Sequence, residues 1–333
     1  MTETKPTITT PFINNFERER EPTAFRRVLR RLSDLDLPAK DHFANYLRHK
    51  WRVNHKPRTI DSSFTSVMLF LQFYEKTGKS DIKEIQRNDL EAFIEHEQDR
   101  GMKISTVRTK MACIIAFLHF LIEQDILSPA VLKRRITLRV PDVLPRAMHP
   151  QDVKKLLSII DHTRDRALIL LLLRTGIRIG EALTLTMNDI DLNERKVHLV
   201  QGEKNNMGRV VYLSNDATFC LRRWFRYRDP EKTLVFYGKG DAPICYSTAR
   251  SRFFKYLQEA GLEHRGYTVH CLRHTNASEL LNAGMRLEVL QQLLGHQDIE
   301  VTRRYARLTD TTRSEEYFRA MAIIEKGEID GDY

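Results

Sequence analysis

The chain has 333 residues, too many for one ordinary hydrophobic core, and suits two domains. Its 54 Lys and Arg residues outnumber 44 Asp and Glu residues, so the net charge is +10 and the pI is near 9.4. A polyanion is therefore the expected partner, and RNA, DNA and acidic lipid all fit the composition.

Two classes of protein fit poorly. The longest purely apolar run, Ala167 to Leu173, is far shorter than the roughly 20 residues that span a bilayer, and the first residues lack a secretory signal pattern. Four scattered cysteines argue against a disulfide framework and a zinc finger. We expect a reduced, cytoplasmic protein without a membrane segment.

Helical periodicity dominates the first 140 residues. Apolar side chains recur at helical spacing from about Thr59 to Lys76 and from about Ser105 to Gln124, which predicts two amphipathic helices of a compact bundle. Residues 1–40 precede this bundle as an N-terminal extension, and we expect residues 1–22 to be flexible.

Basic residues gather on the predicted bundle. Residues 101–140 hold seven Lys or Arg residues against only Glu123 and Asp125. A solvated surface position is the ordinary interpretation of any one of them, but the imbalance as a whole favours contact with a polyanion. The candidate contact residues are Arg58, Arg108, Lys110, Arg134, Arg135 and Arg139.

A segment without helical period separates the bundle from the second half of the chain. Residues 136–148 contain two prolines and are expected to link two domains. A helix is predicted to begin near Pro150, and a second to run from about Thr163 to Arg174, where Gly176 ends it.

The pattern of the second domain then changes from helical to alternating. K-V-H-L-V-Q (196–201) and R-V-V-Y-L (209–213) predict two strands joined by a loop, and helices resume near Asn215. The predicted fold class is mainly α with a small antiparallel β-sheet in the C-terminal domain.

The last quarter of the chain brings chemically active residue types together. Thr268 is a candidate helix cap, which places His270 and Arg273 on one face of the first helical turns. A helix N-terminus favours an anion, and a guanidinium adds a planar fork that matches phosphate oxygens. The L-L-G-H motif presents His296 in a turn, and Tyr305 comes nine residues later.

These residues indicate cleavage of a phosphate diester by tyrosine. A phenol with a pKa of about 10 must attack an anion and a sugar alkoxide must leave, so donors to the phosphate and a general acid are needed. In T-G-I-R-I-G-E-A-L, Arg178 supplies a second guanidinium that Glu181 can orient. Lys204, in the predicted strand loop, is suited to protonate the leaving oxygen.

Taken together, T-G-I-R-I-G-E-A-L, the H-x-x-R of H-C-L-R-H-T, L-L-G-H and the tyrosine after it resemble the signature motifs of tyrosine recombinases of the phage integrase and Xer type. The resemblance is dense from about 145 to 310 and looser from about 42 to 130. It implies a two-domain DNA clamp, with a helical core-binding domain at 41–135 and a catalytic domain at 149–310, followed by a C-terminal helix and acidic tail at 311–333. It also implies that Arg178, Lys204, His270, Arg273 and His296 activate the phosphate, while Tyr305 forms a 3′-phosphotyrosyl link.

The chain departs from the pattern of this family in places. Cys271 stands where many relatives have Asp, and Gly180 where Ser is frequent, and neither change is expected to abolish the chemistry. The loop around Lys204 is longer than the common G-K-G form, which makes this residue the least firmly placed of the set. The basic F-R-R-V-L-R-R segment within residues 1–40 has no counterpart in the resemblance.

Each site residue taken alone also has an ordinary interpretation. His270 and His274 lie four apart and could bind a metal, but no carboxylate or cysteine stands at ligand spacing, so no metal and no cofactor is expected. Arg178 could simply pair with Glu181 at a helix end, and Tyr305 could be a packing residue. The conjunction of the motifs favours phosphate chemistry.

The expected function is site-specific DNA recombination without metal or ATP. The resemblance implies a homotetramer on paired sites of double-stranded DNA, with exchange through a Holliday junction; off DNA a monomer or dimer is expected, and accessory proteins remain open. An apolar stripe of Tyr317, Met321 and Ile324 packs either on its own domain or, as the resemblance implies, on a neighbouring subunit. The alternatives are a type IB topoisomerase and a catalytically silent DNA-binding regulator on the same scaffold.

Overall fold

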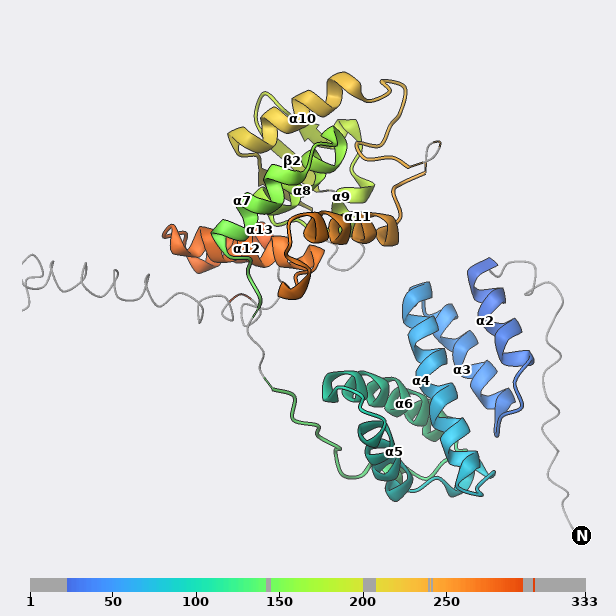
Figure 1. The fold of residues 1–333 in the computed structure, drawn as a ribbon. Helices are drawn as coiled ribbons and strands as arrows, with labels where there is room; N and C mark the ends of the chain where they lie inside the picture. The colour runs from blue at the N-terminus through green and yellow to red at the C-terminus, as the bar shows by residue number, and fades with distance from the viewer. Residues whose placement is uncertain are drawn as a thin grey trace, which may run out of the picture. The chain divides into compact units, whose positions relative to one another are not determined.

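The computed structural model describes residues 23–141, 145–199, 208–238, 240, 242–295 and 302. The chain divides into two compact units, Met1–Asp142 and Val143–Tyr333, and each has its own hydrophobic core (Figure 1). Residues 136–141 and 145–149 form neither helix nor strand.

The first unit is a bundle of helices, as the periodicity predicted. Its helices are α2 (Thr23–Ser33), α3 (Lys40–Arg52), α4 (Pro57–Lys76), α5 (Arg87–Asp99) and α6 (Ile104–Glu123), with short 3-10 turns at Ile82–Glu84 and Pro129–Leu132. The two helices predicted near 59–76 and 105–124 are confirmed as α4 and α6. Their apolar stripes meet in the core, where Phe64, Val67, Leu118 and Leu121 are completely buried.

Helix α6 is apolar and long enough, by length and composition, to cross a bilayer. Its side chains at helical spacing, including Val107, Ile114 and Leu118, are buried among the other helices of the unit, and its exposed face carries Arg108. A one-sided burial of this kind is that of an amphipathic helix packed against the other helices of its unit.

The second unit is mainly helical around one small sheet. Its helices are α7 (Pro150–Ile159), α8 (Thr163–Thr175), α9 (Ile179–Thr184), α10 (Asn215–Tyr227), α11 (Tyr246–Glu259), α12 (Val269–Asn282) and α13 (Leu287–Leu294). Helix α8 lies between α10 and α12 in this unit (Figure 1). This position explains the longest apolar run of the chain, since Ala167 to Leu173 are buried on every side.

The sheet has three antiparallel strands in the order β1-β2-β3. The two predicted strands are β2 (Lys196–Leu199) and β3 (Arg209–Tyr212), in register with Val197 opposite Val211. The short β1 (Ile190–Asp191) was not foreseen, because two residues show no alternation. The predicted fold class, mainly α with a small antiparallel sheet, is confirmed.

Candidate active site

A tight turn between α8 and α9 brings the two signature arginines together. Gly176 ends α8 in the left-handed region with a φ of 65°. A Cβ at this position would lie 2.5 Å from Oδ1 of Asn276 in α12 and 2.9 Å from Cδ2 of Leu294 in α13. Only glycine therefore lets the turn approach these two helices so closely.

Arg273 is buried behind this turn. Its side chain is 3% exposed, and its Nη1 and Nη2 donate to the carbonyl oxygens of Gly176 at 2.5 Å and Leu294 at 2.8 Å. A buried guanidinium with its fork fixed by two backbone oxygens keeps one orientation. The structure thus brings the two motifs together: Arg273 contacts the carbonyl of Gly176, and Arg178 follows Gly176 by two residues.

Arg178 caps α9 and remains about one-third exposed. Its backbone N–H and its Nη1 donate to the two carboxylate oxygens of Glu181 at 2.7 Å and 3.1 Å, and its Nη2 donates to the carbonyl oxygen of Gly295 at 3.4 Å. Glu181 therefore orients Arg178 as the spacing suggested, while leaving the guanidinium accessible to an anion.

A third arginine, which no motif in the sequence indicated, joins this site. Arg209, at the start of β3, donates from Nη1 and Nη2 to both oxygens of Glu181 at 3.1 Å and 2.8 Å, and from Nε to the carbonyl oxygen of Leu293 at 2.9 Å. A bidentate pair of this kind is the strong form of an arginine–carboxylate contact. The only feature of the sequence that could have indicated Arg209 is its charge at the start of an otherwise uncharged strand.

The three arginines converge on one short stretch of backbone. Arg209, Arg273 and Arg178 donate to the carbonyls of Leu293, Leu294 and Gly295 respectively. Leu293 and Leu294 are the last residues of α13, and Gly295 is its C-cap. Carbonyls at the end of a helix have no partner within it and carry the negative end of the helix dipole. The guanidiniums therefore fix the end of the helix that leads into the L-G-H motif.

The charges of this cluster shift two nearby pKa values. Burial alone raises the pKa of Glu181, but the hydrogen bond and charge of Arg209, followed by those of Arg178, outweigh it and hold the pKa below its usual value. Partial desolvation, and then the positive charges of Arg273 and Arg178, lower the pKa of His270. His270 is therefore a neutral imidazole at pH 7 in the absence of an anion, able to donate one N–H.

The helix start that carries His270 is built as expected. Thr268 is the N-cap of α12, and its backbone N–H donates to Sγ of Cys271 at 3.3 Å. The thiol of Cys271 thus accepts from the backbone of the N-cap residue. The ring of His270 meets the ring of His274 edge to face, with 4.6 Å between the centroids.

Three predicted site residues, Lys204, His296 and Tyr305, lie outside the described residues, as do the tail at 311–333 and the apolar stripe within it.

On the first unit, five of the candidate DNA contacts are exposed: Arg58, Arg108, Arg134, Arg135 and Arg139. Lys110 differs, because its Nζ is paired with Glu97, whose side chain is only 1% exposed. That pairing favours a structural role for Lys110.

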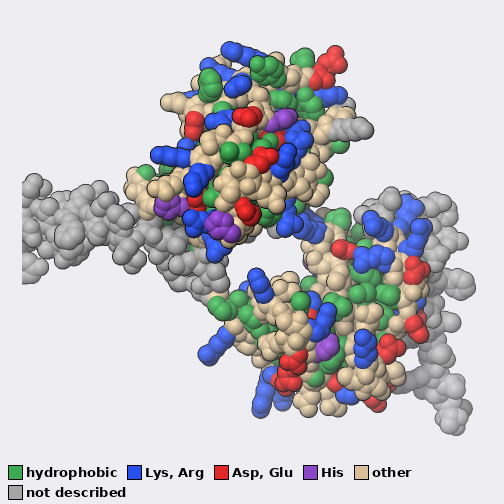
Figure 2. Space-filling model, viewed as in Figure 1, with side chains coloured by type: hydrophobic (Ala, Val, Ile, Leu, Met, Phe, Trp, Pro, Cys, Tyr) green, Lys and Arg blue, Asp and Glu red, His purple; other side chains and the backbone are tan. Residues whose placement is uncertain are grey.

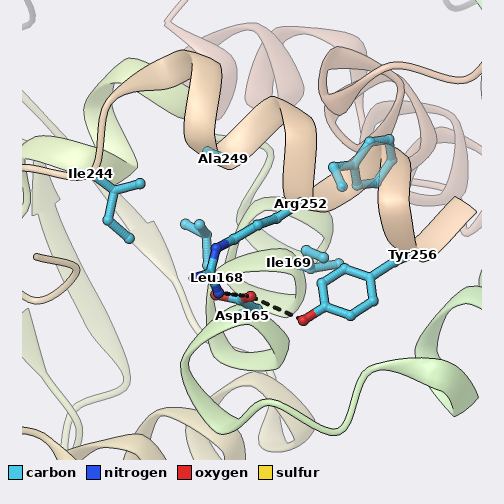
Figure 3. Close-up of a pocket in the computed structure, with 8 residues that line it drawn as sticks. Asp165, Leu168, Ile169, Ile244, Ala249, Arg252 and Tyr256 are labelled. Carbon is cyan, nitrogen blue, oxygen red and sulfur yellow. Dashed lines mark hydrogen bonds and ion pairs between the residues drawn. The ribbon is translucent and has the colours of Figure 1, made fainter. Parts of the chain in front are cut away.

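A separate small pocket lies between α8 and α11 (Figure 3). Oδ2 of Asp165 accepts from Nη1 of Arg252 at 2.7 Å and from the hydroxyl of Tyr256 at 3.0 Å, and Oδ1 accepts from Nε of Arg164 at 3.1 Å. These contacts hold the pKa of Asp165 below its usual value although burial opposes them. The rest of its lining is apolar. The bonds of Asp165 to Arg252 and Tyr256 join α8 to α11. Within the described ranges, no three His, Cys, Asp or Glu residues are grouped to hold a metal ion.

Comparison with known proteins gives matches over both units. The sequence profile described as the phage integrase family matches residues 146–312, and the profile described as the phage integrase N-terminal SAM-like domain matches residues 41–125. Tyrosine recombinase XerC of Roseiflexus castenholzii is 29% identical over 281 residues, covering 79% of this chain and 87% of the relative. Tyrosine recombinase XerD of Listeria monocytogenes is 29% identical over 252 residues, covering 70% and 81%.

Solved structures share the fold at low identity. The integrase of transposon Tn1549, in complex with transposon right end DNA, matches with a TM-score of 0.71 at 20% identity, covering 84% of this chain and 98% of that one. A lambda integrase dimer bound to a core site matches with a TM-score of 0.64 at 15% identity, covering 78% and 96%.

Proposed function

The chain belongs to the phage integrase family and is a site-specific recombinase of double-stranded DNA, and we propose that it works through a 3′-phosphotyrosyl intermediate formed by Tyr305. The observation that carries this proposal is the convergence of Arg178 and Arg273 on the neighbouring carbonyls of Gly295 and Leu294, beside the Gly176 turn. Two guanidiniums beside a neutral imidazole form a preorganised set of donors for a phosphate whose charge grows in the transition state.

The proposed reaction has two transfers. The phenolic oxygen of Tyr305 attacks the scissile phosphorus, the bond to the 5′-oxygen breaks, and Lys204 gives that oxygen a proton. Arg178, Arg273, His270 and His296 hold the non-bridging oxygens. A 5′-hydroxyl of a partner duplex then attacks the phosphotyrosine and releases the phenol, so the energy of the diester is conserved and no nucleotide is consumed.

A suicide substrate tests the nucleophile. A duplex nicked next to the cleavage position loses the short fragment and traps the covalent complex, which a denaturing gel separates from free protein. We expect the unchanged chain to form the complex, and Tyr305→Phe to bind the same DNA with no covalent product. A covalent complex formed by Tyr305→Phe would show that another residue attacks.

A second substrate tests the acid. Lys204→Ala should retain binding and slow cleavage, and a substrate whose leaving group needs no proton should restore the rate. Absence of that rescue would remove Lys204 from the acid role.

The two rival activities predict different products. A type IB topoisomerase would relax supercoiled DNA without paired sites and yield no recombinants. A catalytically silent regulator would bind DNA and form no covalent complex. The convergence of the arginines with His270 favours catalysis over the silent scaffold.

The proposal extends to assembly and cell biology. Exchange of both strand pairs through a Holliday junction requires four subunits on paired sites. Off DNA we expect the protein to be a monomer or a dimer. The four cysteines are free, which fits a reducing, cytoplasmic location. Residues 136–148 would link a core-binding domain at 41–135 to a catalytic domain at 149–310, with exposed arginines such as Arg58 and Arg108 contacting phosphates.

A further inference from the structure

Helix α2 lies outside the range of the matched SAM-like domain, which begins at residue 41. It is nevertheless docked on that domain. Phe25, Val28 and Leu32 are buried, and the ring of Phe25 stacks on Trp51 of α3 with 5.6 Å between centroids. The helix is therefore a fixed part of the first unit.

The charged residues of α2 are all arginines, and they lie on its outer face. Arg26, Arg27, Arg30 and Arg31 are all exposed, and α2 contains no acidic residue. Figure 2 shows Lys and Arg side chains gathered on the face of this unit where Figure 1 places α2. At a spacing of four residues these arginines form two like-charged pairs, and the first two lie near the positive end of the helix dipole.

Repulsion between these like charges lowers the stability of the free protein. Beside a polyanion the same charges are favourable, because each can pair with a negative group. One acid that α2 contacts is Asp61 of α4, paired with Nη1 of Arg31 at 2.8 Å, while the same guanidinium lies 4.5 Å from the ring centre of Phe64. This contact places the end of α2 beside the second turn of α4, one turn from the exposed Arg58. The α2 arginines thus continue a basic surface of the same unit.

We propose that α2 is an additional DNA-binding surface that contacts phosphates of the duplex, with Arg27 and Arg30 at its centre. The proposal rests on the proposed function, because it takes DNA as the polyanion. Arginines three or four residues apart on a helix are separated by about 4.5–6 Å along its axis. Each DNA strand carries a phosphate about every 3.4 Å of duplex axis, so neighbouring arginines reach different phosphates. Contacts of this kind hold the protein on DNA without reading bases.

The test compares two double variants that remove equal charge. Arg27→Gln with Arg30→Gln changes α2. Arg223→Gln with Arg226→Gln changes exposed positions on α10, which packs on α8 away from α12 (Figure 1). Dissociation constants are measured on a target duplex and on an unrelated duplex of the same length, at several salt concentrations.

We expect the α2 variant to bind both duplexes about tenfold more weakly at moderate salt, with the salt slope reduced by about 0.9 for each phosphate that the variant no longer neutralises. The ratio between target and unrelated DNA should not change. The α10 variant should stay close to the unchanged chain. Because the α2 change relieves repulsion between like charges, its unfolding temperature should be equal or higher, which separates weaker phosphate binding from misfolding.

Equal effects in both variants would reduce the role of α2 to net charge and overturn the proposal. Unchanged affinity and salt slope in the α2 variant would also overturn it, and would assign the helix to an acidic protein surface or to no partner. The suicide substrate separates this outcome from failure of the proposed function. If the unchanged chain binds DNA but forms no covalent complex, the recombinase chemistry fails while the α2 comparison still stands.

Discussion

At the scale of single residues, motif spacing predicted the residues proposed to contact the phosphate but not the residue that positions them. Arg178, His270 and Arg273 were predicted from their motifs, and the structure brings them together. Arg209 escaped prediction because its bond to Glu181 joins positions 28 residues apart, on a strand and a helix whose packing no local pattern encodes. Whether Lys204 and Tyr305 complete the site stays a prediction.

Arg209 is expected to act as a positioning residue through Glu181 and the end of α13. Arg209→Ala removes the bidentate partner of a carboxylate whose pKa it helps to lower, so the pKa of Glu181 should rise and Arg178 should lose its fixed orientation. We expect covalent complex formation at saturating DNA to slow by about 100-fold with little change in DNA affinity.

Arg209→Lys should recover part of that rate, because lysine restores the charge but not the fork. Arg223→Ala serves as the control at an exposed position. A purely structural role for Arg209 predicts a lower unfolding temperature with an unchanged rate at saturating DNA, and that result would exclude positioning.

The lowered pKa of His270 predicts proton uptake on DNA binding. Burial, followed by the charges of Arg273 and Arg178, lowers this pKa in the free protein, and a bound phosphate offsets the two charges and raises it. Protonation then favours the complex, so affinity should rise as the pH falls through the pKa of the bound state and level off below that of the free state.

This effect is measured as the DNA affinity of Tyr305→Phe between pH 5 and 8, an interval on either side of the ordinary histidine pKa of about 6.5. The same variant with His270→Gln supplies the control. If both respond to pH alike, the phosphate does not lie near His270.

At the scale of elements, period and breaker residues predicted the principal helices and where one of them ends. The apolar period gave α4 and α6, and Gly176 ended α8 as expected. Two features could not be predicted. The strand β1 is too short to show alternation, and the reason for Gly176 lies in α12 and α13, about 100 residues away, because their side chains leave no room for a Cβ.

Gly176 and Gly180 make a matched pair for testing this turn. Gly176→Ala meets both a positive φ and contacts of 2.5 Å and 2.9 Å, so it should reduce the free energy of unfolding by about 1–3 kcal/mol and slow cleavage by displacing Arg178. Gly180→Ala meets no atom within 4 Å in a helical position and should be neutral or stabilising. Chemical denaturation of both variants decides this, and equal stability would show that the turn can relax.

At the scale of the whole molecule, length and charge predicted two domains and a polyanionic partner. The two separate cores agree with the first of these, and the family agrees with the second. Composition could not predict which surface of the protein carries the basic residues. The basic face of α2 exists because Phe25, Val28 and Leu32 dock the opposite face of the helix.

The same distribution of charge predicts a reaction that needs neither metal nor nucleotide. In the proposed site the charge on the phosphate is met by Arg178, Arg273 and an imidazole, which together supply the electrostatic role that a divalent cation has in other phosphoryl transfers. We expect the covalent complex to form at the same rate in EDTA as in Mg²⁺, at matched ionic strength and without ATP. The ionic strength must be matched because Mg²⁺ screens DNA and weakens phosphate contacts for reasons unrelated to catalysis. A rate that collapses in EDTA and returns at micromolar Mg²⁺, too little to change the screening, would mean that a metal joins the arginines at the phosphate.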